Sequence, residues 1–229
     1  MRTAAIIVAA GSGSRFGSPT PKQFLKLNGK TVIAHTIERF AASPSIDSIV
    51  LVLSADRIGE FVGAGSEKLA AVVPGGDSRA ASVRNGLDAL ADDIEIVAVH
   101  DGARPLVTVK EIEATVAKAK ETGAACLAAP VTDTIKSVRG GEIVATLDRD
   151  KLRRALTPQA FKREVLRASF ETEDLTAATD ECFLVEKLGH PIAIVDGSPR
   201  NIKITHPEDL ILAEALMAAE MRGHAALPD

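Results

Sequence analysis

The sequence predicts an α/β protein, in which a mostly parallel sheet carries helices on both faces and a β-hairpin arm projects from one side. Short apolar runs rich in Val and Ile, such as residues 4–10 and 48–54, alternate along the chain with segments of helical spacing. Runs of this kind are typical of parallel strands that are covered on both faces. The alternation stops at about residues 132–154, where two extended segments meet at a Gly-Gly pair, and this pattern predicts the hairpin.

Length and composition indicate one globular domain, and we expect it to span residues 1–229. No linker rich in Pro, Gly or Ser divides the 229 residues, and apolar residues make up 46% of them. The net charge of −4 argues against a nucleic-acid surface, which needs a basic face. No apolar stretch is long enough to cross a bilayer, and Met1-Arg2-Thr3 leads directly into the first predicted strand. We therefore expect a cytoplasmic protein without membrane or nucleic-acid partners.

The cysteines and histidines predict no metal centre. Cys126 and Cys182 are far apart and form no Cys-x-x-Cys pair, and the five histidines show no metal-ligand spacing. Cys126 lies within an apolar run and is interpreted as a small buried side chain.

A glycine loop follows the first predicted strand. Gly11 and Gly13 lack a Cβ, so the backbone can bring its N–H groups close to an anion, and Arg15 and Lys22 add positive charge nearby. Gly17 comes one residue too late for the dinucleotide fingerprint, and no P-loop pattern is present. A tight turn with exposed basic residues is the alternative for the glycines alone, whereas the two cations favour a triphosphate-binding loop.

The segments that follow predict a right-handed β-α-β unit. Residues 31–42 have helical apolar spacing and end at Ser43-Pro44, and residues 48–54 form the second strand. A weaker helix is predicted over residues 57–69, ahead of a short strand at residues 71–73.

A second glycine loop, residues 74–79, opens a second helix over residues 80–90, with Asp77 or Ser78 as its N-cap. The strand over residues 95–100 then leads to Asp101 and Arg104. In open parallel sheets the ligand crevice lies beyond the carboxyl ends of the strands, where these two side chains must lie. The alternative is that Asp101 only caps its own turn.

The rest of the chain continues the pattern around the hairpin. Thr108 and Glu111 predict a capping box for a helix that ends at Gly123. A strand at residues 124–131 precedes the hairpin, whose two runs are residues 134–139 and 142–147. Because an isolated hairpin is only marginally stable in water, we expect this arm to pack on a second subunit.

The mixed-charge run at residues 148–154 is interpreted as a solvated helix face for Lys151, Arg153 and Arg154. After it, the sequence predicts a helix from residues 179–181 to Gly189, strands at residues 191–195 and 201–205, and a last helix that Pro207 opens.

In this order, the motifs resemble the family of 2-C-methyl-D-erythritol 4-phosphate cytidylyltransferases. The resemblance runs from the first strand to the last helix, and no single motif carries it alone. The stretches that match are residues 9–15 with 21–23, 75–79 with Ser82, 100–105, Thr134, Arg149, 157–159, 179–181 and 201–205.

The resemblance implies a Rossmann-like nucleotidyltransferase fold, transfer of the cytidylyl group of CTP to methylerythritol phosphate, Mg²⁺ as cofactor, and a homodimer formed through the β-arm. The implied catalytic residues are Arg15, Lys22, Arg149 and Lys203. The implied CTP-binding residues are Ala9, Ala10, Gly11, Gly13, Gly76, Asp77 and Ser82. The implied acceptor-binding residues are Asp101, Arg104, Thr134, Arg149, Thr157, Thr179 and Lys203, with Asp101 also placed at the metal.

Two departures and three rival interpretations accompany this resemblance. Gly102 stands where many relatives have Ala, which should loosen the loop, and Phe183 stands where a small residue is expected. The nearest rival is a cytidylyltransferase for ribitol 5-phosphate or another polyol phosphate. A nucleotide-binding regulatory module without catalysis is disfavoured because the charged residues of the site are all present. A nicotinamide-dependent dehydrogenase is disfavoured by the glycine spacing.

Overall fold

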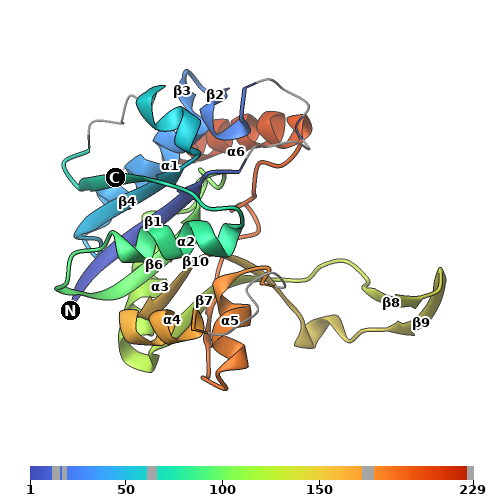
Figure 1. Ribbon diagram of the computed structural model, residues 1–229. Helices are drawn as coiled ribbons and strands as arrows, with labels where there is room; N and C mark the ends of the chain where they lie inside the picture. Colours follow the sequence, from blue (N-terminus) through green and yellow to red (C-terminus); the bar gives the residue numbers. More distant parts are fainter. Residues whose placement is uncertain (12–15, 17–19, 61–65, 172–177, 226–229) are drawn as a thin grey trace.

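The computed structural model describes residues 1–11, 16, 20–60, 66–171 and 178–225. Its centre is a seven-stranded sheet in which all strands run the same way except β10, which is antiparallel to both its neighbours. In spatial order the strands are β11 (Ala193–Asp196), β7 (Ala124–Pro130), β10 (Arg153–Lys162), β6 (Ile94–Asp101), β1 (Arg2–Ala9), β4 (Ser48–Leu53) and β5 (Leu69–Pro74). The mostly parallel α/β sheet predicted from the sequence is therefore confirmed (Figure 1).

Helices cover both faces of the sheet, as the apolar runs predict. The helices are α1 (Val32–Ala42), α2 (Arg79–Asp88), α3 (Val109–Thr122), α4 (Arg163–Ser169), α5 (Glu181–Lys187) and α6 (Pro207–Ala225). One core lies under α2, α4 and α5, and the other lies under α1 and α3 (Figure 1). Helix α6 packs at the edge of the second face through a smaller cluster that includes Leu27, Ile204 and Ala213. Within the described ranges, no helix is both long and apolar enough to cross a membrane.

The predicted helix starts hold in detail. Thr31 and Ser78 cap α1 and α2 with their hydroxyls, so the N-cap of α2 is Ser78 rather than Asp77. Thr108 and Glu111 form the predicted capping box at the start of α3. Asp180 caps α5, and Pro207 is the first residue of α6. Each of these signals depends on side chains within one turn, which is why the sequence alone reveals them.

The hairpin arm consists of β8 (Lys136–Arg139) and β9 (Glu142–Thr146), which form a separate two-stranded sheet. Gly140 and Gly141 both have positive φ, 58° and 86°, as a tight hairpin turn between right-twisted strands requires. Figure 1 shows the arm projecting well away from the main sheet. Its apolar side chains are consequently exposed in the single chain, including Val138, Ile143 and Val144.

Three local predictions are wrong. Residues 57–60 belong to a 3-10 helix, Ala55–Glu60, instead of an α-helix, and Leu69 pairs with Ile49 as the first residue of β5; residues 61–65 lie outside the described ranges. Residues 201–205 are not a strand: their backbone has one hydrogen bond to the neighbouring loop, from Ile204 N to Ala103 O at 2.8 Å. A single bond of this kind orients the segment without forming a ladder.

The third wrong prediction concerns the charged run ahead of Leu156. Arg149–Lys151 is a short 3-10 helix, and Arg153 and Arg154 begin β10 instead of lying on a helix face. The pairing of β10 with β7 is irregular between Ala155 and Gln159, which accommodates Pro158, a residue without an N–H for the ladder. β10 returns the chain from the arm into the sheet, and α4, which the sequence analysis also missed, follows it directly.

Candidate active site

Two adjoining clefts open at the carboxyl edge of the parallel strands. The larger, about 430 Å³, lies between the ends of β1 and β6 and the loop before α2. The smaller, about 150 Å³, lies between the end of β6, β10 and the residues before α5. Among the lining residues, Arg79, Asp101 and Lys203 belong to both clefts. The position is the one expected for the ligand crevice of an open parallel sheet.

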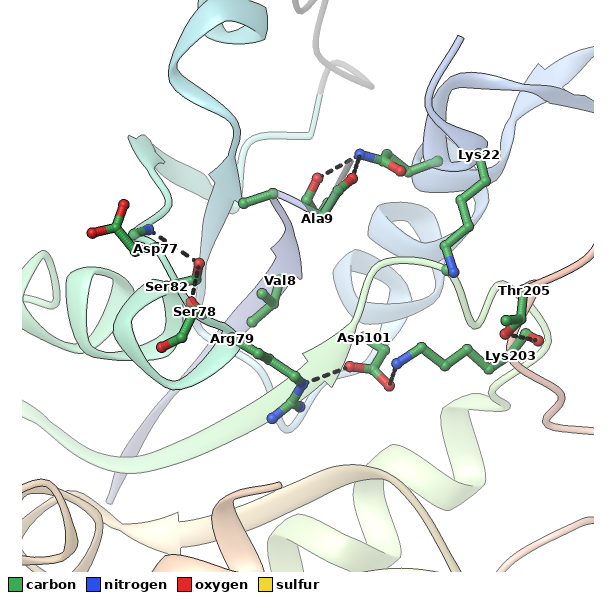
Figure 2. A pocket seen from close by; sticks show the side chains of 15 residues that line it. Val8, Ala9, Lys22, Asp77, Ser78, Arg79, Ser82, Asp101, Lys203 and Thr205 are labelled. Atoms are coloured by element: carbon green, nitrogen blue, oxygen red, sulfur yellow. Dashed lines mark hydrogen bonds and ion pairs between the residues drawn. The ribbon is translucent and has the colours of Figure 1, made fainter. Parts of the chain in front are cut away.

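The larger cleft gathers most of the predicted nucleotide residues. Its lining includes Ala9, Ala10, Gly11, Lys22, Gly76, Asp77, Ser82, Asp101 and Lys203. Figure 2 shows Lys22 extending from above toward the space that Lys203 also enters. The predicted Gly13 and Arg15 lie outside the described residues.

Local hydrogen bonds fix the two loops of this cleft. Gln23 donates its side-chain amide to Ala9 O at 2.7 Å and to Gly11 O at 3.1 Å, which holds the start of the first glycine loop. Ser82 accepts from Gly76 N at 3.1 Å and donates to Ser78 O at 2.9 Å, which holds the second loop against α2. The sequence alone indicates no role for Gln23, because only the folded chain brings it against the end of β1 and Gly11.

Asp101 is the centre of the charge cluster. Its carboxylate accepts from Arg79 Nε at 3.2 Å, from Arg104 Nε at 3.4 Å and from Lys203 Nζ at 2.9 Å. Figure 2 shows the contacts with Arg79 and Lys203. Burial alone would raise the pKa of Asp101, but the three cations outweigh burial and hold that pKa well below its usual range. Three cations around one carboxylate leave an excess of positive charge, which favours anionic ligands.

Arg79 and Glu181 extend this cluster and were not among the predicted site residues. Arg79 Nη1 donates to Glu181 Oε1 at 2.6 Å, and Glu181 is only 1% exposed. Burial raises the pKa of Glu181 and would lower that of Arg79, but the Glu181 and Asp101 carboxylates outweigh burial and raise the pKa of Arg79. The guanidinium therefore stays charged. The sequence signals for Arg79 and Glu181 were their places in the matched stretches 75–79 and 179–181.

The smaller cleft gathers Arg104, Thr157 and Thr179 with Lys203, as predicted for the acceptor side. Arg104 also donates through Nη1 to Asn201 O at 2.8 Å, which orients its guanidinium. Thr157 is buried, and its hydroxyl accepts from Asp101 N at 3.2 Å and bonds His100 Nδ1 at 3.0 Å. In this structure Thr157 therefore positions the Asp101 loop, because its hydroxyl already bonds both Asp101 N and His100 Nδ1.

Two predicted site residues lie apart from both clefts. Thr134 is exposed on the arm, and Arg149 at its base donates through Nη1 to Thr132 O at 2.9 Å. Neither residue lines either cleft, and the hairpin of the arm projects away from the main sheet (Figure 1). The two clefts of a chain are therefore formed without Thr134 and Arg149 of that chain.

A parallel α/β sheet with paired, positively charged clefts at its carboxyl edge is the arrangement of an enzyme that joins a nucleotide to a second anionic substrate, a nucleotidyltransferase. The comparison with known proteins agrees. The family model described as "IspD: 2-C-methyl-D-erythritol 4-phosphate cytidylyltransferase" matches residues 3–219. The chain belongs to this cytidylyltransferase family.

Individual relatives support the same assignment. The 2-C-methyl-D-erythritol 4-phosphate cytidylyltransferase of Desulforamulus reducens is 46% identical over 93% of this chain and 94% of its own length. The crystal structure of the enzyme of that name from Francisella tularensis is 33% identical, with a TM-score of 0.80 over 93% of this chain and 98% of that one. The structure of the Thermus thermophilus enzyme is 31% identical, with a TM-score of 0.79 over 95% and 100%. The predicted nucleotidyltransferase fold is thereby confirmed.

Proposed function

We propose that this chain transfers the cytidylyl group of CTP to 2-C-methyl-D-erythritol 4-phosphate, forming 4-diphosphocytidyl-2-C-methyl-D-erythritol and pyrophosphate. The observation that carries the proposal is the pair of adjoining clefts with Arg79, Asp101 and Lys203 on their common wall. Two anionic substrates seated in neighbouring clefts would meet at that wall. The chain belongs to a family named for cytidylyl transfer to this same acceptor, 2-C-methyl-D-erythritol 4-phosphate.

CTP occupies the larger cleft in this proposal. Backbone groups at Ala9, Ala10 and Gly11 face the phosphates, and Lys22 neutralises them, with Gly13 and Arg15 assigned the same task by the resemblance. Gly76 and Asp77 bind the cytidine, and Ser82, whose hydroxyl bonds Gly76 N and Ser78 O, holds their loop in place. The loop geometry that Gln23 and Ser82 maintain supports this division, because oriented backbone dipoles act without reorganisation.

The acceptor phosphate occupies the smaller cleft, where Arg104, Lys203 and Thr179 bind it. A phosphate monoester is already an anionic nucleophile near neutral pH, so its oxygen attacks the α-phosphorus of CTP without a strong general base. The obstacle is repulsion between two polyanions and the charge that builds on the leaving pyrophosphate. The cations lower this barrier by neutralising both substrates and by holding the attacking oxygen in line.

Mg²⁺ is the proposed cofactor, with Asp101 as its protein carboxylate. Magnesium in nucleotide sites is usually held by one or two carboxylates together with substrate phosphates, and a single Asp at the common wall fits that pattern. No group of three or more candidate metal ligands occurs within the described ranges, so the phosphates would supply most of the oxygens. Bound there, the ion would neutralise phosphate charge. Asp101 would exchange a cation contact, such as that with Arg79 at 3.2 Å, to receive it.

A homodimer formed through the arm completes the proposed site. Val138, Ile143 and Val144 are all more than half exposed on a hairpin that forms a sheet separate from the main one. An apolar two-stranded arm of this kind gains stability by packing on a partner. The partner would receive Thr134 and Arg149, with Arg149 acting on the acceptor phosphate of the other subunit.

The function is tested by following pyrophosphate release with purified protein, CTP and Mg²⁺. Methylerythritol phosphate should support turnover, and ribitol 5-phosphate at the same concentration should support much less. Preference for ribitol 5-phosphate would reassign the acceptor, and no pyrophosphate release with any polyol phosphate would contradict the assigned activity.

A further inference from the structure

Arg79 lies on the common wall of the two clefts without an assigned role. It is the first residue of α2, and its guanidinium lies between Asp101 and Glu181 (Figure 2 shows the Asp101 side). The helix does not depend on this side chain. Ser78 caps it, and Ala80, Val83 and Leu87 pack it on the sheet.

The two ion pairs of Arg79 differ in how easily they can be exchanged. The pair with Glu181 measures 2.6 Å, Glu181 is almost fully buried, and its other oxygen, Oε2, has no hydrogen-bond partner among the described residues. Taking Arg79 away would leave a buried carboxylate without a cation, which is strongly unfavourable. Removing Arg79 would be less unfavourable for Asp101, because Asp101 would keep its ion pairs with Arg104 and Lys203.

This asymmetry makes Glu181 an anchor and Asp101 an exchangeable partner. With Nη1 held on Glu181, rotation of the planar group can move Nε and Nη2 away from Asp101. The described residues give Nη2 no hydrogen bond of its own. Nε and Nη2 together form the fork that binds two oxygens of a phosphate, a geometry that lysine cannot provide.

We propose that Arg79 is a further catalytic residue, which leaves Asp101 when both substrates bind and contacts the non-bridging oxygens of the α-phosphoryl group while Glu181 holds it. The inference rests on the proposed function, because the α-phosphorus is the atom at which the bond between the two substrates forms. That atom has to lie where the CTP cleft meets the acceptor cleft, and Arg79 lines both. Charge on the equatorial oxygens of the transferred group is what a guanidinium stabilises best.

The test compares Arg79→Ala and Arg79→Lys with the matched control Arg84→Ala, which removes the same charge from an exposed position on the same helix. With CTP and methylerythritol phosphate saturating, Arg79→Ala should lower kcat at least about a hundredfold, the scale for losing one preorganised charge. Arg79→Lys should recover only part of the loss, and Arg84→Ala should stay within about twofold of wild type.

A second readout separates contact from mere structural support. Replacing one non-bridging α-oxygen by sulfur gives two diastereomers of CTPαS, and wild type should discriminate against the isomer whose sulfur faces Arg79. In Arg79→Ala and Arg79→Lys the ratio of kcat/KM between the isomers should change at least about tenfold, since the discriminating group is gone. A loss of packing alone would slow both isomers alike.

The outcomes are distinguishable from failure of the assigned activity, which would leave wild type itself without pyrophosphate release. If wild type is active, a kcat within about threefold for a folded Arg79→Ala overturns the proposal. So does an increase in the acceptor KM at unchanged kcat, which would assign Arg79 to ground-state binding. Should Arg79→Ala fail to fold, a folded Arg79→Lys decides: an unchanged isomer ratio contradicts the contact.

Discussion

His100 gives the sharpest prediction about pH, because the fold keeps its imidazole neutral. The ring is fully buried, and burial lowers its pKa from 6.5 to about 3. Its Nε2 bonds Arg104 O at 3.2 Å, and since a carbonyl can only accept, Nε2 carries the proton. Nδ1 then accepts from the Thr157 hydroxyl at 3.0 Å. A second proton on this ring would break the bond from Thr157.

The sign and size of the effect follow from linkage. Between pH 6.5 and pH 3 the unfolded chain protonates His100 and the folded chain does not, so stability falls as the pH falls through this window. From pH 7 to pH 5 the expected loss from this one group is about 1.9 kcal/mol. Any folded-state pKa of His100 below about 4 gives the same loss to within about 0.1 kcal/mol. The loss is large, because the whole free energy of unfolding of a domain is only about 5–15 kcal/mol.

The assay is urea unfolding of wild type and of His100→Asn at both pH values. Asparagine keeps an acceptor for Thr157 and does not titrate, so other groups cancel when the two pH dependences are subtracted. The variant should be less stable at pH 7 but should lose about 1.9 kcal/mol less on going to pH 5. Equal losses in the two proteins would refute a neutral, buried His100.

Three further predictions concern the site and its supports. Lys22→Ala should lower kcat at least about a hundredfold with an unchanged thermal midpoint, and near-normal turnover would remove Lys22 from catalysis. Mixing Lys22→Ala with Arg149→Ala chains should restore roughly a quarter of the sites if Arg149 acts across the dimer, because half of the dimers are then mixed and each mixed dimer has one intact site. If no activity is recovered, Arg149 acts within its own chain. Gly102→Ala should cost about 1–3 kcal/mol in unfolding free energy, since a Cβ there would lie 2.9 Å from Ala9 Cβ, whereas Gly59→Ala, with open space around it, is the control.

That last prediction reverses the sequence-based expectation for Gly102. Glycine there does more than loosen the loop, because its missing Cβ leaves room for Ala9, Ile33 and Val8 O. Gly102 N also donates to Val8 O at 2.8 Å, so the loop after β6 is held close to the end of β1 at this point. Phe183, the other noted departure, packs at the margin of the core under α5, with Lys187 Nζ 4.7 Å from its ring centre.

The features that could be predicted from the sequence depend mainly on residues that lie close together along the chain. Apolar runs mark β1, β4 and β6 because these strands are buried on both faces, and the caps of α2 and α3 depend on groups only three residues apart. The position of Asp101 beyond β6 follows from a general rule for parallel sheets. The roles of Arg104 and Lys203 came only from the resemblance, and the structure brings both to Asp101.

What the sequence could not predict depends on contacts between distant segments. β10 begins with two arginines and contains Pro158, features that disfavour a central strand, yet it pairs with both β6 and β7 in the middle of the sheet. The ion pair of Arg79 with Glu181 joins residues 102 positions apart, and no periodicity can indicate it. Pairings of this kind are specified by the whole fold.

The cluster around Asp101 explains how the free protein can keep three cations close together at the site. Without the carboxylate, Arg104 and Lys203 would repel each other and Arg79, and Glu181 alone would hold Arg79; with it, all three cations are held at the wall where the two clefts meet. Substrate phosphates would then replace a carboxylate that is already solvated by these cations, so little reorganisation is needed when they bind. Asp101 thus holds the three cations in place before any substrate binds. In the exchange proposed for Arg79, the guanidinium leaves Asp101 for a substrate phosphate, and its ion pair with Glu181 keeps it at the wall.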